Sequence, residues 1–362
     1  MQKKIRVANL DLLRIFSMFL IILLHSIDHS GVLEAATKSG LAMNGYIKFL
    51  YFMCQICVNC YVLISGYFLV NSKFKLEKLI YLWIEVVFYS LVIKLIFMII
   101  GTTPFSLTSL VSCFIPITTG RYWFITIYFG LYLIFPFLNI AIKNMNKEQH
   151  GKLNFILIFL FSILISISPT FAGMNSGGAW GLPWFIVLYF IASWFRLYYK
   201  PNKNIKRRLL CYIFILLLIT GITLISERHL FFIQNIVKNI YRYDHIFSLI
   251  CSLLIFSMFL DLKINNLLAT RIISKMAPLT LGVYLIHAHA ELDTEIWDWL
   301  GLLKHINSIT FPFYQLLIVL MILFVCMFID YIRNKIFDFL NVRNICKKIQ
   351  SLFYKCLNCI VK

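Results

Sequence analysis

The chain has 362 residues, of which 61% are hydrophobic and only 14% are charged, and its mean hydropathy is +0.84. A soluble domain is about 45–50% apolar and about 25% charged. The composition therefore excludes a water-soluble enzyme, a secreted disulfide scaffold and a disordered chain. Apolar blocks of about twenty residues also exclude an outer-membrane barrel, whose strands alternate. We expect an all-α polytopic membrane protein.

Ten apolar segments are predicted to be transmembrane helices. They are Leu10–Ile27, Tyr46–Val70, Leu79–Gly101, Tyr122–Ile142, Leu153–Phe171, Gly181–Tyr199, Leu209–Ile225, His245–Leu262, Met276–Ala290 and Phe311–Ile332. The ninth is short and ends in histidine and acidic residues. The apolar segment Ser106–Ile117 is too short to span a membrane, and we interpret it as a loop or a re-entrant piece.

The formal net charge of +19, from 34 basic and 15 acidic residues, is distributed unevenly between the two sides of these segments. One side holds the loop Lys73–Lys78, the run Lys200–Arg208 and the chain after Arg333. The positive-inside rule then places both termini in the cytoplasm. We therefore expect a multi-pass protein of the plasma (inner) membrane, attracted to anionic lipid, with no nucleic-acid partner.

The chain is predicted to form one membrane domain, residues 1–335, and a basic amphipathic cytoplasmic tail, residues 336–362, on the inner surface. The first span follows basic residues as a signal peptide does, but no small-x-small cleavage site follows Leu24, so we interpret it as a retained anchor. Cys54, Cys57 and Cys60 have a spacing found in metal sites. Their apolar surroundings favour helix packing instead, and no metal is expected.

The first predicted span carries two ionisable residues, Arg14 and His25, which are costly inside a membrane. Eleven residues turn a helix by about 1100°, within about 20° of three full turns, and advance it by about 16 Å. Both side chains therefore lie on one face, where Arg14 is suited to an anion and His25 to proton abstraction, with Asp28 orienting the ring. The alternative is an Arg14–Asp11 pair and a purely structural histidine.

Four motifs in this order resemble the acyltransferase 3 family, integral membrane enzymes that acetylate or otherwise acylate surface glycans and lipids. They are Asn9-Leu-Asp-Leu-Leu-Arg14 followed by ten residues and His25; Ile64-Ser-Gly-Tyr-Phe68; Tyr122-Trp-Phe with Tyr132, Pro136 and Asn139; and Gly282-Val-Tyr-Leu-Ile-His287. The resemblance covers about Ile5 to Ile332.

The resemblance implies cytoplasmic acetyl-CoA as acyl donor, with no permanently bound cofactor, and a hydroxyl of a cell-surface or lipid-linked glycan as acceptor. Arg14, Lys75 and Lys78 then bind the CoA phosphates, and His25 is the general base, or carries a transient acetyl group. Many members have Arg-x-x-Arg where this chain has Lys75-Leu-Glu-Lys78, which keeps the charge but loses the bidentate fork.

Further residues are predicted to bind or support the acceptor. His287, oriented by Glu291, lies near the depth of His25 and is either a second functional histidine or a structural hydrogen-bonding group. Arg121 and Trp123 lie at the outer mouth of the fourth span, where an interfacial aromatic belt explains Trp123 almost as well. Tyr67, in the Ser-Gly-aromatic motif, completes the set. Some family members carry an extracytoplasmic esterase-like domain, so a separate partner is an alternative to transfer within this domain.

Two buried charges have no evident role. Glu85 and Lys94 are nine residues apart, about 180° around a helix, and so each needs a different partner. Buried charges in a polytopic chain also suit a secondary transporter or exporter that performs no chemistry, although no corresponding pair of broken helices is evident. A polysaccharide polymerase or ligase is a third interpretation. Such enzymes usually need a large outer loop, and the predicted outer loops of this chain are short. The Lys-, Ile-, Asn- and Phe-rich composition is typical of an AT-rich bacterial genome.

Overall fold

A computed structural model describes residues 8–167, 177–202, 204–229 and 239–360, and these residues form helices and turns with no β-strand. The predicted all-α class is therefore confirmed. The α-helices are α1 (Ala8–Asp28), α2 (Val32–Lys38), α3 (Leu41–Cys54), α4 (Cys57–Leu69), α5 (Leu76–Ile100), α6 (Leu107–Phe114), α7 (Trp123–Lys143), α8 (Lys147–Ile158), α9 (Leu164–Ile167), α10 (Leu182–Tyr198), α11 (Ile205–His229), α13 (Ile246–Asp261), α14 (Leu267–Met276), α15 (Thr280–His287), α16 (Glu295–Trp299), α17 (Phe311–Phe339) and α18 (Val342–Ile360).

Shorter helical pieces connect some of these elements. A π-helical turn, η1 (Phe159–Ile163), joins α8 to α9, and 3₁₀ turns form η3 (Gly178–Trp180), η5 (Ala277–Leu279) and η6 (Leu302–His305). The predicted re-entrant segment Ser106–Ile117 contains the short helix α6.

Seven helices in the described ranges are long and apolar enough to cross a membrane, so the chain is a multi-pass membrane protein. They are Ala8–Asp28, Leu41–Leu69, Leu76–Ile100, Trp123–Lys143, Lys147–Ile167, Ile205–Glu227 and Phe311–Phe339. The apolar helices α10 and α13 are shorter, and the predicted ninth span yields only the eight-residue α15. The end of the predicted fifth span, residues 168–171, lies outside the described residues. The count of ten spans and the side on which the termini lie stay predictions.

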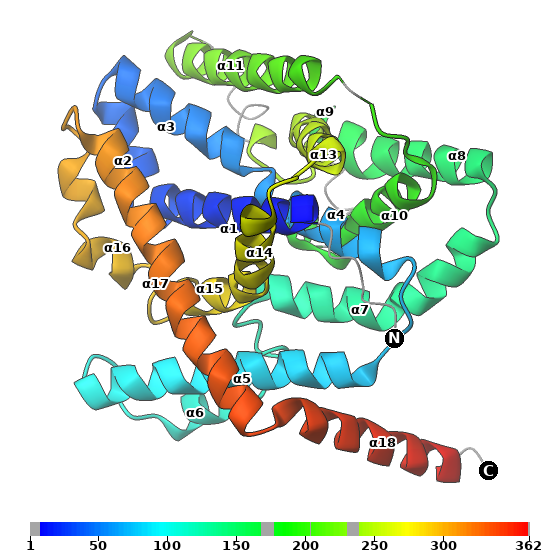
Figure 1. The fold of residues 1–362 in the computed structure, drawn as a ribbon. Helices are drawn as coiled ribbons and strands as arrows, with labels where there is room; N and C mark the ends of the chain where they lie inside the picture. The colour runs from blue at the N-terminus through cyan, green and yellow to red at the C-terminus, as the bar shows by residue number, and fades with distance from the viewer. Residues whose placement is uncertain (1–7, 168–176, 203, 230–238, 361–362) are drawn as a thin grey trace.

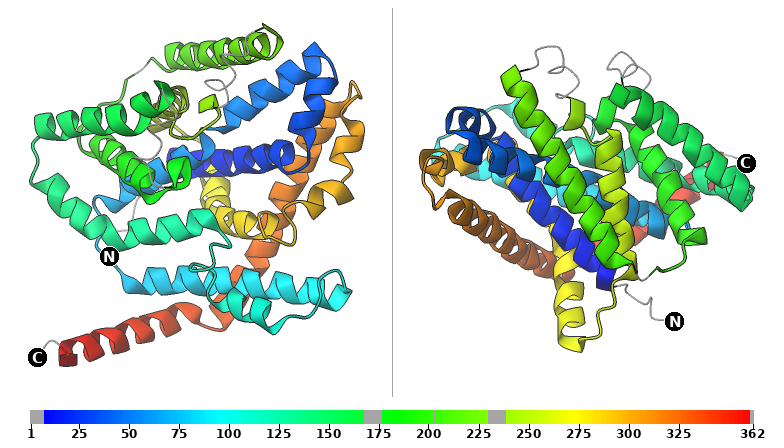
Figure 2. Two further views of the ribbon diagram at one scale, coloured as in Figure 1. Left: turned by 180° about the vertical axis from the view of Figure 1, so that it is seen from behind. Right: turned by 90° about the horizontal axis from the view of Figure 1, so that it is seen from above.

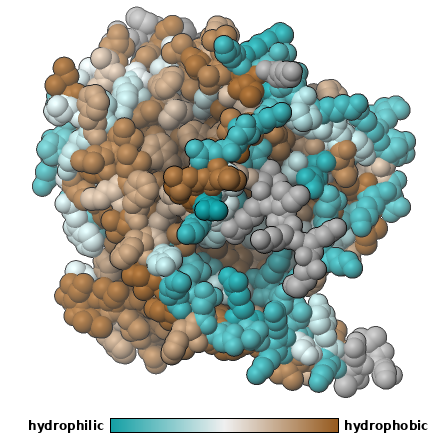
Figure 3. Space-filling model, in the orientation of Figure 1, coloured by the Kyte–Doolittle hydropathy of each residue, from teal (hydrophilic) through white to brown (hydrophobic). Residues whose placement is uncertain are grey.

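Helix α1 runs through the middle of the bundle, where it packs against α3, α4, α13, α14, α15 and α17 (Figure 1). The two further views show the same central position, with α17 crossing the bundle at one side (Figure 2). Because neighbours surround α1 on several sides, polar side chains such as Ser17 and Ser26 are buried in the bundle. Hydrophobic side chains cover most of the left and centre of the face drawn in Figure 3, and hydrophilic ones gather mainly on the right, over α8 and along α18.

The predicted second span is broken into α3 and α4 at Gln55 and Ile56. Directly after the break, the Asn59 amide donates to the Tyr243 carbonyl oxygen at 2.8 Å and accepts from Trp184 Nε1 at 3.0 Å. These bonds tie α4 to α10 and to the chain before α13. A buried amide with its hydrogen bonds satisfied stabilises such a contact, whereas an unpaired one costs about 1–3 kcal/mol. Asn59 therefore bridges elements of the bundle.

Helices α4 and α10 approach most closely at Gly66, within the Ser-Gly-aromatic motif. A Cβ atom built on Gly66 would lie 2.8 Å from the Ala192 Cβ and 3.3 Å from the Tyr189 Cα. We expect Gly66→Ala to destabilise the protein by about 1–3 kcal/mol because the two helices must separate. The measurement is the melting temperature in detergent. Gly221→Ala is the control: nothing lies within 4 Å of its Cβ position, so an equal loss in both variants would contradict the packing argument.

Candidate active site in the helical bundle

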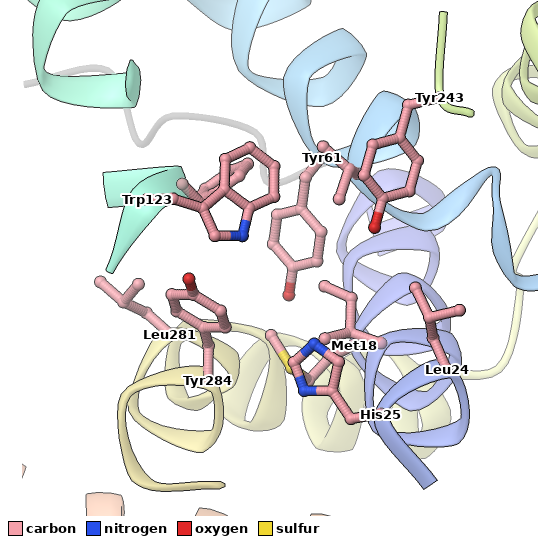
Figure 4. A pocket seen from close by; sticks show the side chains of 11 residues that line it. Met18, Leu24, His25, Tyr61, Trp123, Tyr243, Leu281 and Tyr284 are labelled. Atoms are coloured by element: carbon pink, nitrogen blue, oxygen red, sulfur yellow. The ribbon is translucent and has the colours of Figure 1, made fainter. Parts of the chain in front are cut away.

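Arg14 and His25 border successive cavities along α1. A cavity of about 50 Å³ surrounds the His25 ring, and we call it the His25 chamber. It is lined by Met18, Ile21, Leu24, His25, Val58, Tyr61, Trp123, Phe124, Tyr243, Leu281 and Tyr284. Figure 4 shows His25, Tyr61, Trp123 and Tyr284 directed toward the same space. The chamber is built from α1, α4, α7 and α15, so residues far apart in sequence meet at one imidazole.

Two larger cavities, of about 290 and 330 Å³, border Arg14, and we call them together the Arg14 cavity. Both are lined by Arg14, Ser65, Leu82, Tyr128 and Leu281. The smaller one shares Tyr61, Phe124 and Leu281 with the His25 chamber. The smaller Arg14 cavity and the His25 chamber are therefore neighbours, and they border the face of α1 on which the helical spacing places Arg14 and His25.

The His25 ring lies in a group of three histidines. Its centroid is 4.5 Å from that of His29, which stacks on it, and 5.1 Å from that of His287. The fully buried His287 bonds the Val283 carbonyl oxygen through Nδ1 at 2.6 Å, which makes Nδ1 the protonated nitrogen and leaves Nε2 as an acceptor. Neither His25 Nδ1 nor His287 Nε2 has a hydrogen-bond partner in the described residues. Buried polar atoms are normally paired, so a substrate group or water is the expected partner.

The predicted partner of the His25 ring is not the residue that contacts it. Asp28 is exposed and accepts a hydrogen bond from the Tyr51 hydroxyl at 3.4 Å. Three residues turn a helix about 60° short of a full turn, whereas four overshoot it by about 40°. His29, four residues after His25, therefore stacks on the ring, and Asp28 lies to one side.

The predicted acceptor residues divide between the chamber and the rest of the bundle. Trp123 lines the His25 chamber, and the motif histidine His287 lies beside His25. Arg121 instead reaches α6, where Nη2 donates to Ser112 Oγ at 3.0 Å. Tyr67 accepts a hydrogen bond from Arg196 Nη1 at 3.1 Å and borders neither cavity. The structure thus brings together two of these four residues.

The two predicted donor lysines also separate. Lys78 lines the Arg14 cavity. Lys75 does not, and its side chain is 55% exposed with Nζ 3.5 Å from a carboxylate oxygen of Glu77. Arg14 itself lies 3.7 Å from Asp11, a long contact that leaves the guanidinium side chain 30% exposed. The cavity therefore contains two cations from the predicted donor set.

Glu291 does not orient His287, which corrects the expectation from the sequence. Its carboxylate bonds Lys94 Nζ at 2.5 Å and the Thr103 hydroxyl at 2.9 Å. Burial raises the pKa of the Glu291 carboxyl, but the hydrogen bonds from Lys94 and Thr103 outweigh burial and hold the pKa below its usual value. Lys94 and Glu85 do have separate partners, as their spacing predicts, since Glu85 pairs with Arg333.

Several site residues are missing from the sequence predictions. Tyr61, Tyr243 and Tyr284 line the chamber, and the hydroxyl of Tyr61 has no hydrogen-bond partner in the described residues. Tyr284 was marked by its place in the Gly-x-Tyr-Leu-x-His motif. The glycine of that motif, Gly282, is required because a Cβ there would overlap the Asp330 carboxyl of α17.

Among the described residues, no group of three or more His, Cys, Asp or Glu side chains is placed so that it could hold a metal ion. Cys54, Cys57 and Cys60 are buried free thiols that pack between helices.

A polytopic helical bundle with an imidazole lining one cavity and cations lining its neighbour defines a membrane-embedded protein with the means for general-base chemistry. The family model described as acyltransferase domain matches residues 7–331, nearly the whole chain. The chain belongs to the acyltransferase 3 family, whose activity is acyl transfer at a membrane. No curated protein and no solved structure matches the chain.

Proposed function

We propose that the protein is a membrane O-acetyltransferase that moves an acetyl group from cytoplasmic acetyl-CoA to a hydroxyl of a cell-surface or lipid-linked glycan. The observation that carries this proposal is the series of cavities along α1, with a guanidinium at one end and an imidazole at the other. Acetyl-CoA is a substrate here, and no resident cofactor is required.

The donor is assigned to the Arg14 cavity, because a CoA-type donor carries phosphates and this cavity offers two cations. Arg14 binds a phosphate bidentately, and Lys78 binds as a point charge. Lys75 does not line the cavity, but its carbonyl oxygen accepts a hydrogen bond from Tyr132, which does. The thioester then extends along α1 toward His25, over the roughly 16 Å that eleven helical residues span.

The size of the His25 chamber favours a short acyl group. One water molecule needs about 10–15 Å³ of cavity volume. A cavity of about 50 Å³ therefore holds only a few non-hydrogen atoms. An acetyl group fits this space, whereas a long acyl chain requires the walls to move. Aromatic side chains, among them Tyr61, Trp123 and Tyr284, form much of the chamber wall.

In the proposed reaction His25 takes the proton of the acceptor hydroxyl. The hydroxyl oxygen attacks the thioester carbonyl carbon, forming a C–O bond as the C–S bond breaks. The leaving CoA thiolate takes the proton from the imidazolium, which returns the base to its neutral form. Trp123 and Tyr284 present aromatic surfaces beside the ring, suited to the apolar face of a sugar.

A transient acetyl-histidine is the alternative route to the same products. The two routes are distinguished by incubating the protein with labelled acetyl-CoA without acceptor, quenching rapidly without acid, and measuring the label bound to the protein. Direct transfer predicts no label on the protein, whereas a stoichiometric, heat-labile label that His25→Gln abolishes requires the covalent route.

The test of the proposed function is transfer of radiolabelled acetyl from acetyl-CoA in inverted membrane vesicles. Label in the glycan or lipid fraction that depends on the protein is the expected result. No transfer above background, with intact protein and native glycan present, would contradict the proposal and favour solute export.

The donor role of Arg14 predicts a specific kinetic change. A hydrogen bond to a charged group contributes about 1.5–3 kcal/mol, so Arg14→Gln should raise the KM for acetyl-CoA roughly 10- to 100-fold. The measurement is the donor dependence of label transfer at saturating acceptor. Arg271→Gln removes an exposed charge on α14, away from both cavities, and should leave the KM unchanged. An unchanged KM in both variants would remove Arg14 from the donor site.

A further inference from the structure

A separate cavity of about 330 Å³ lies between α5 and the C-terminal helix α18, and we call it the α18 cavity. Its lining residues are Glu77, Lys78, Tyr81, Arg343, Cys346 and Lys347. Three cations and one carboxylate therefore border it, which favours an anionic ligand. Residues after 331 lie outside the family match, so α18 and its two cations are a feature of this chain beyond the matched domain.

Helix α18 is fixed against α5 by specific contacts. Val342 and Cys346 are buried in a small apolar cluster with Phe337. Gln350 Oε1 accepts a hydrogen bond at 2.7 Å from the backbone N–H of Glu77, in the first turn of α5. Figure 1 shows α18 running beside α5 and out beyond the bundle. The helix is thus held at a defined position relative to the start of α5.

This docking directs the cations of α18 toward the cavity. Arg343 and Lys347 are four residues apart and so lie on one helical face. The Arg343 guanidinium carbon lies 5.8 Å from the centroid of the Tyr81 ring, within the range of a cation–π contact. The planar guanidinium of Arg343 can bind a phosphate through two N–H groups at once.

The rest of α18 has the pattern of a helix at a membrane surface. Ile345, Ile349 and Leu352 are exposed on one side, while Lys348 and Lys355 are exposed on another. An amphipathic helix of this kind lies in the interface with its apolar side in the lipid. The α18 cavity is then at the boundary between water and lipid, where a soluble nucleotide enters.

The α18 cavity adjoins the Arg14 cavity, since Lys78 and Tyr81 line both. Tyr81 also accepts a hydrogen bond from Arg333 Nη1 at 3.2 Å, which fixes the ring between them. Lys78 and Tyr81 are therefore common lining residues of two neighbouring cavities.

We propose that the α18 cavity is a phosphate site that binds the nucleotide end of the acyl donor through Arg343, Lys347 and Lys78. The loop before α5 offers only lysines, and Arg343 supplies the planar fork that they lack. This inference rests on the proposed function. A phosphate of a lipid headgroup has the same chemistry, but the lining shared with the Arg14 cavity, where the acyl donor is proposed to bind, favours the soluble nucleotide.

The test is binding of adenosine 3′,5′-bisphosphate, measured by calorimetry on the full chain in nanodiscs of neutral phosphatidylcholine. Arg343→Gln and Lys347→Gln should each weaken binding at least about tenfold, as expected for loss of a charge-assisted hydrogen bond. Arg343→Lys should weaken it less than Arg343→Gln, because it keeps the charge but not the fork. Lys348→Gln, an exposed charge outside the cavity, should bind as wild type does. Equal melting temperatures confirm that all variants are folded.

Equal affinity of wild type and both glutamine variants would overturn the proposal. A second set of nanodiscs with anionic phosphatidylglycerol separates the two phosphate sources. If the Arg343 and Lys347 variants change only the effect of phosphatidylglycerol, and not nucleotide affinity, the site binds lipid and the proposal is also overturned. The calorimetric measurement of nucleotide binding does not depend on acyl transfer. Nucleotide binding that requires Arg343 and Lys347, in a protein that transfers no acetyl group, would contradict the proposed function but support the phosphate site.

Discussion

His25→Ala is expected to lower acetyl transfer by at least about 100-fold, since a positioned general base contributes typically 10²–10⁴-fold. The imidazole borders a chamber of about 50 Å³, where it is the group on α1 able to accept a proton. His25→Gln keeps much of the volume and the polarity of the side chain and should lose activity equally. The measurement is label transfer per mole of protein at saturating acetyl-CoA.

The control for this prediction is a histidine elsewhere in the chain. His305 is exposed in η6, where it packs against Tyr314, and His305→Ala should transfer acetyl at the wild-type rate. Equal expression and melting temperature exclude loss of folding as the cause. Wild-type activity in His25→Ala would remove this residue from the reaction and direct attention to His287, 5.1 Å away between ring centroids.

The relation of Arg14 to His25 could be predicted because both residues lie on one helix. Helical periodicity alone fixes their common face and their separation along the axis. That they border cavities depends on the neighbours of α1, and the sequence supports this only through the cost of burying charge. The family motifs supply the remaining partners, Trp123 and His287, which come from α7 and α15.

Partners across the bundle could not be predicted from the positions of charges along the chain. Glu291 and Asp28 were expected to orient His287 and His25, three or four residues away on the same stretch of chain, yet they bond Lys94 and Tyr51 from other helices. Arg121 likewise turns to α6. An ionisable side chain in an apolar environment pairs with an oppositely charged or polar group within reach. Tertiary packing determines which group that is.

The predicted spans show a related limit. Hydropathy identifies the seven long apolar helices but does not locate breaks inside an apolar run, such as the one between α3 and α4. Backbone groups freed at a break are tolerated where protein surrounds them. Asn59 is buried and fully bonded just after this break, which only the folded bundle reveals.

Arg333→Met is expected to cause the largest loss of stability. The guanidinium bonds Glu85 of α5 at 2.5 Å and Asp330 of α17 at 2.6 Å, and all three side chains are buried. Removing the cation leaves two carboxylates buried together, and breaking a buried pair in this way costs about 3–5 kcal/mol. The measurement is the melting temperature in detergent. Lys335→Met, an exposed position two residues further along α17, is the matched control and should melt as wild type does.

Replacing the two carboxylates by amides in the same variant separates the effect of uncompensated charge from the effect of the lost hydrogen-bond geometry. In Arg333→Met combined with Glu85→Gln and Asp330→Asn, no uncompensated charge remains, so much of the lost stability should return. Glu85 also lines the Arg14 cavity, and Asp330 packs on Gly282 of the motif that carries His287. The network therefore holds α5, α15 and α17 together beside the Arg14 cavity. If this cavity binds the donor as proposed, the neutral triple variant should be stable yet bind acetyl-CoA less tightly. A triple variant no more stable than Arg333→Met would show that the network acts through its hydrogen-bonded shape and not through charge balance.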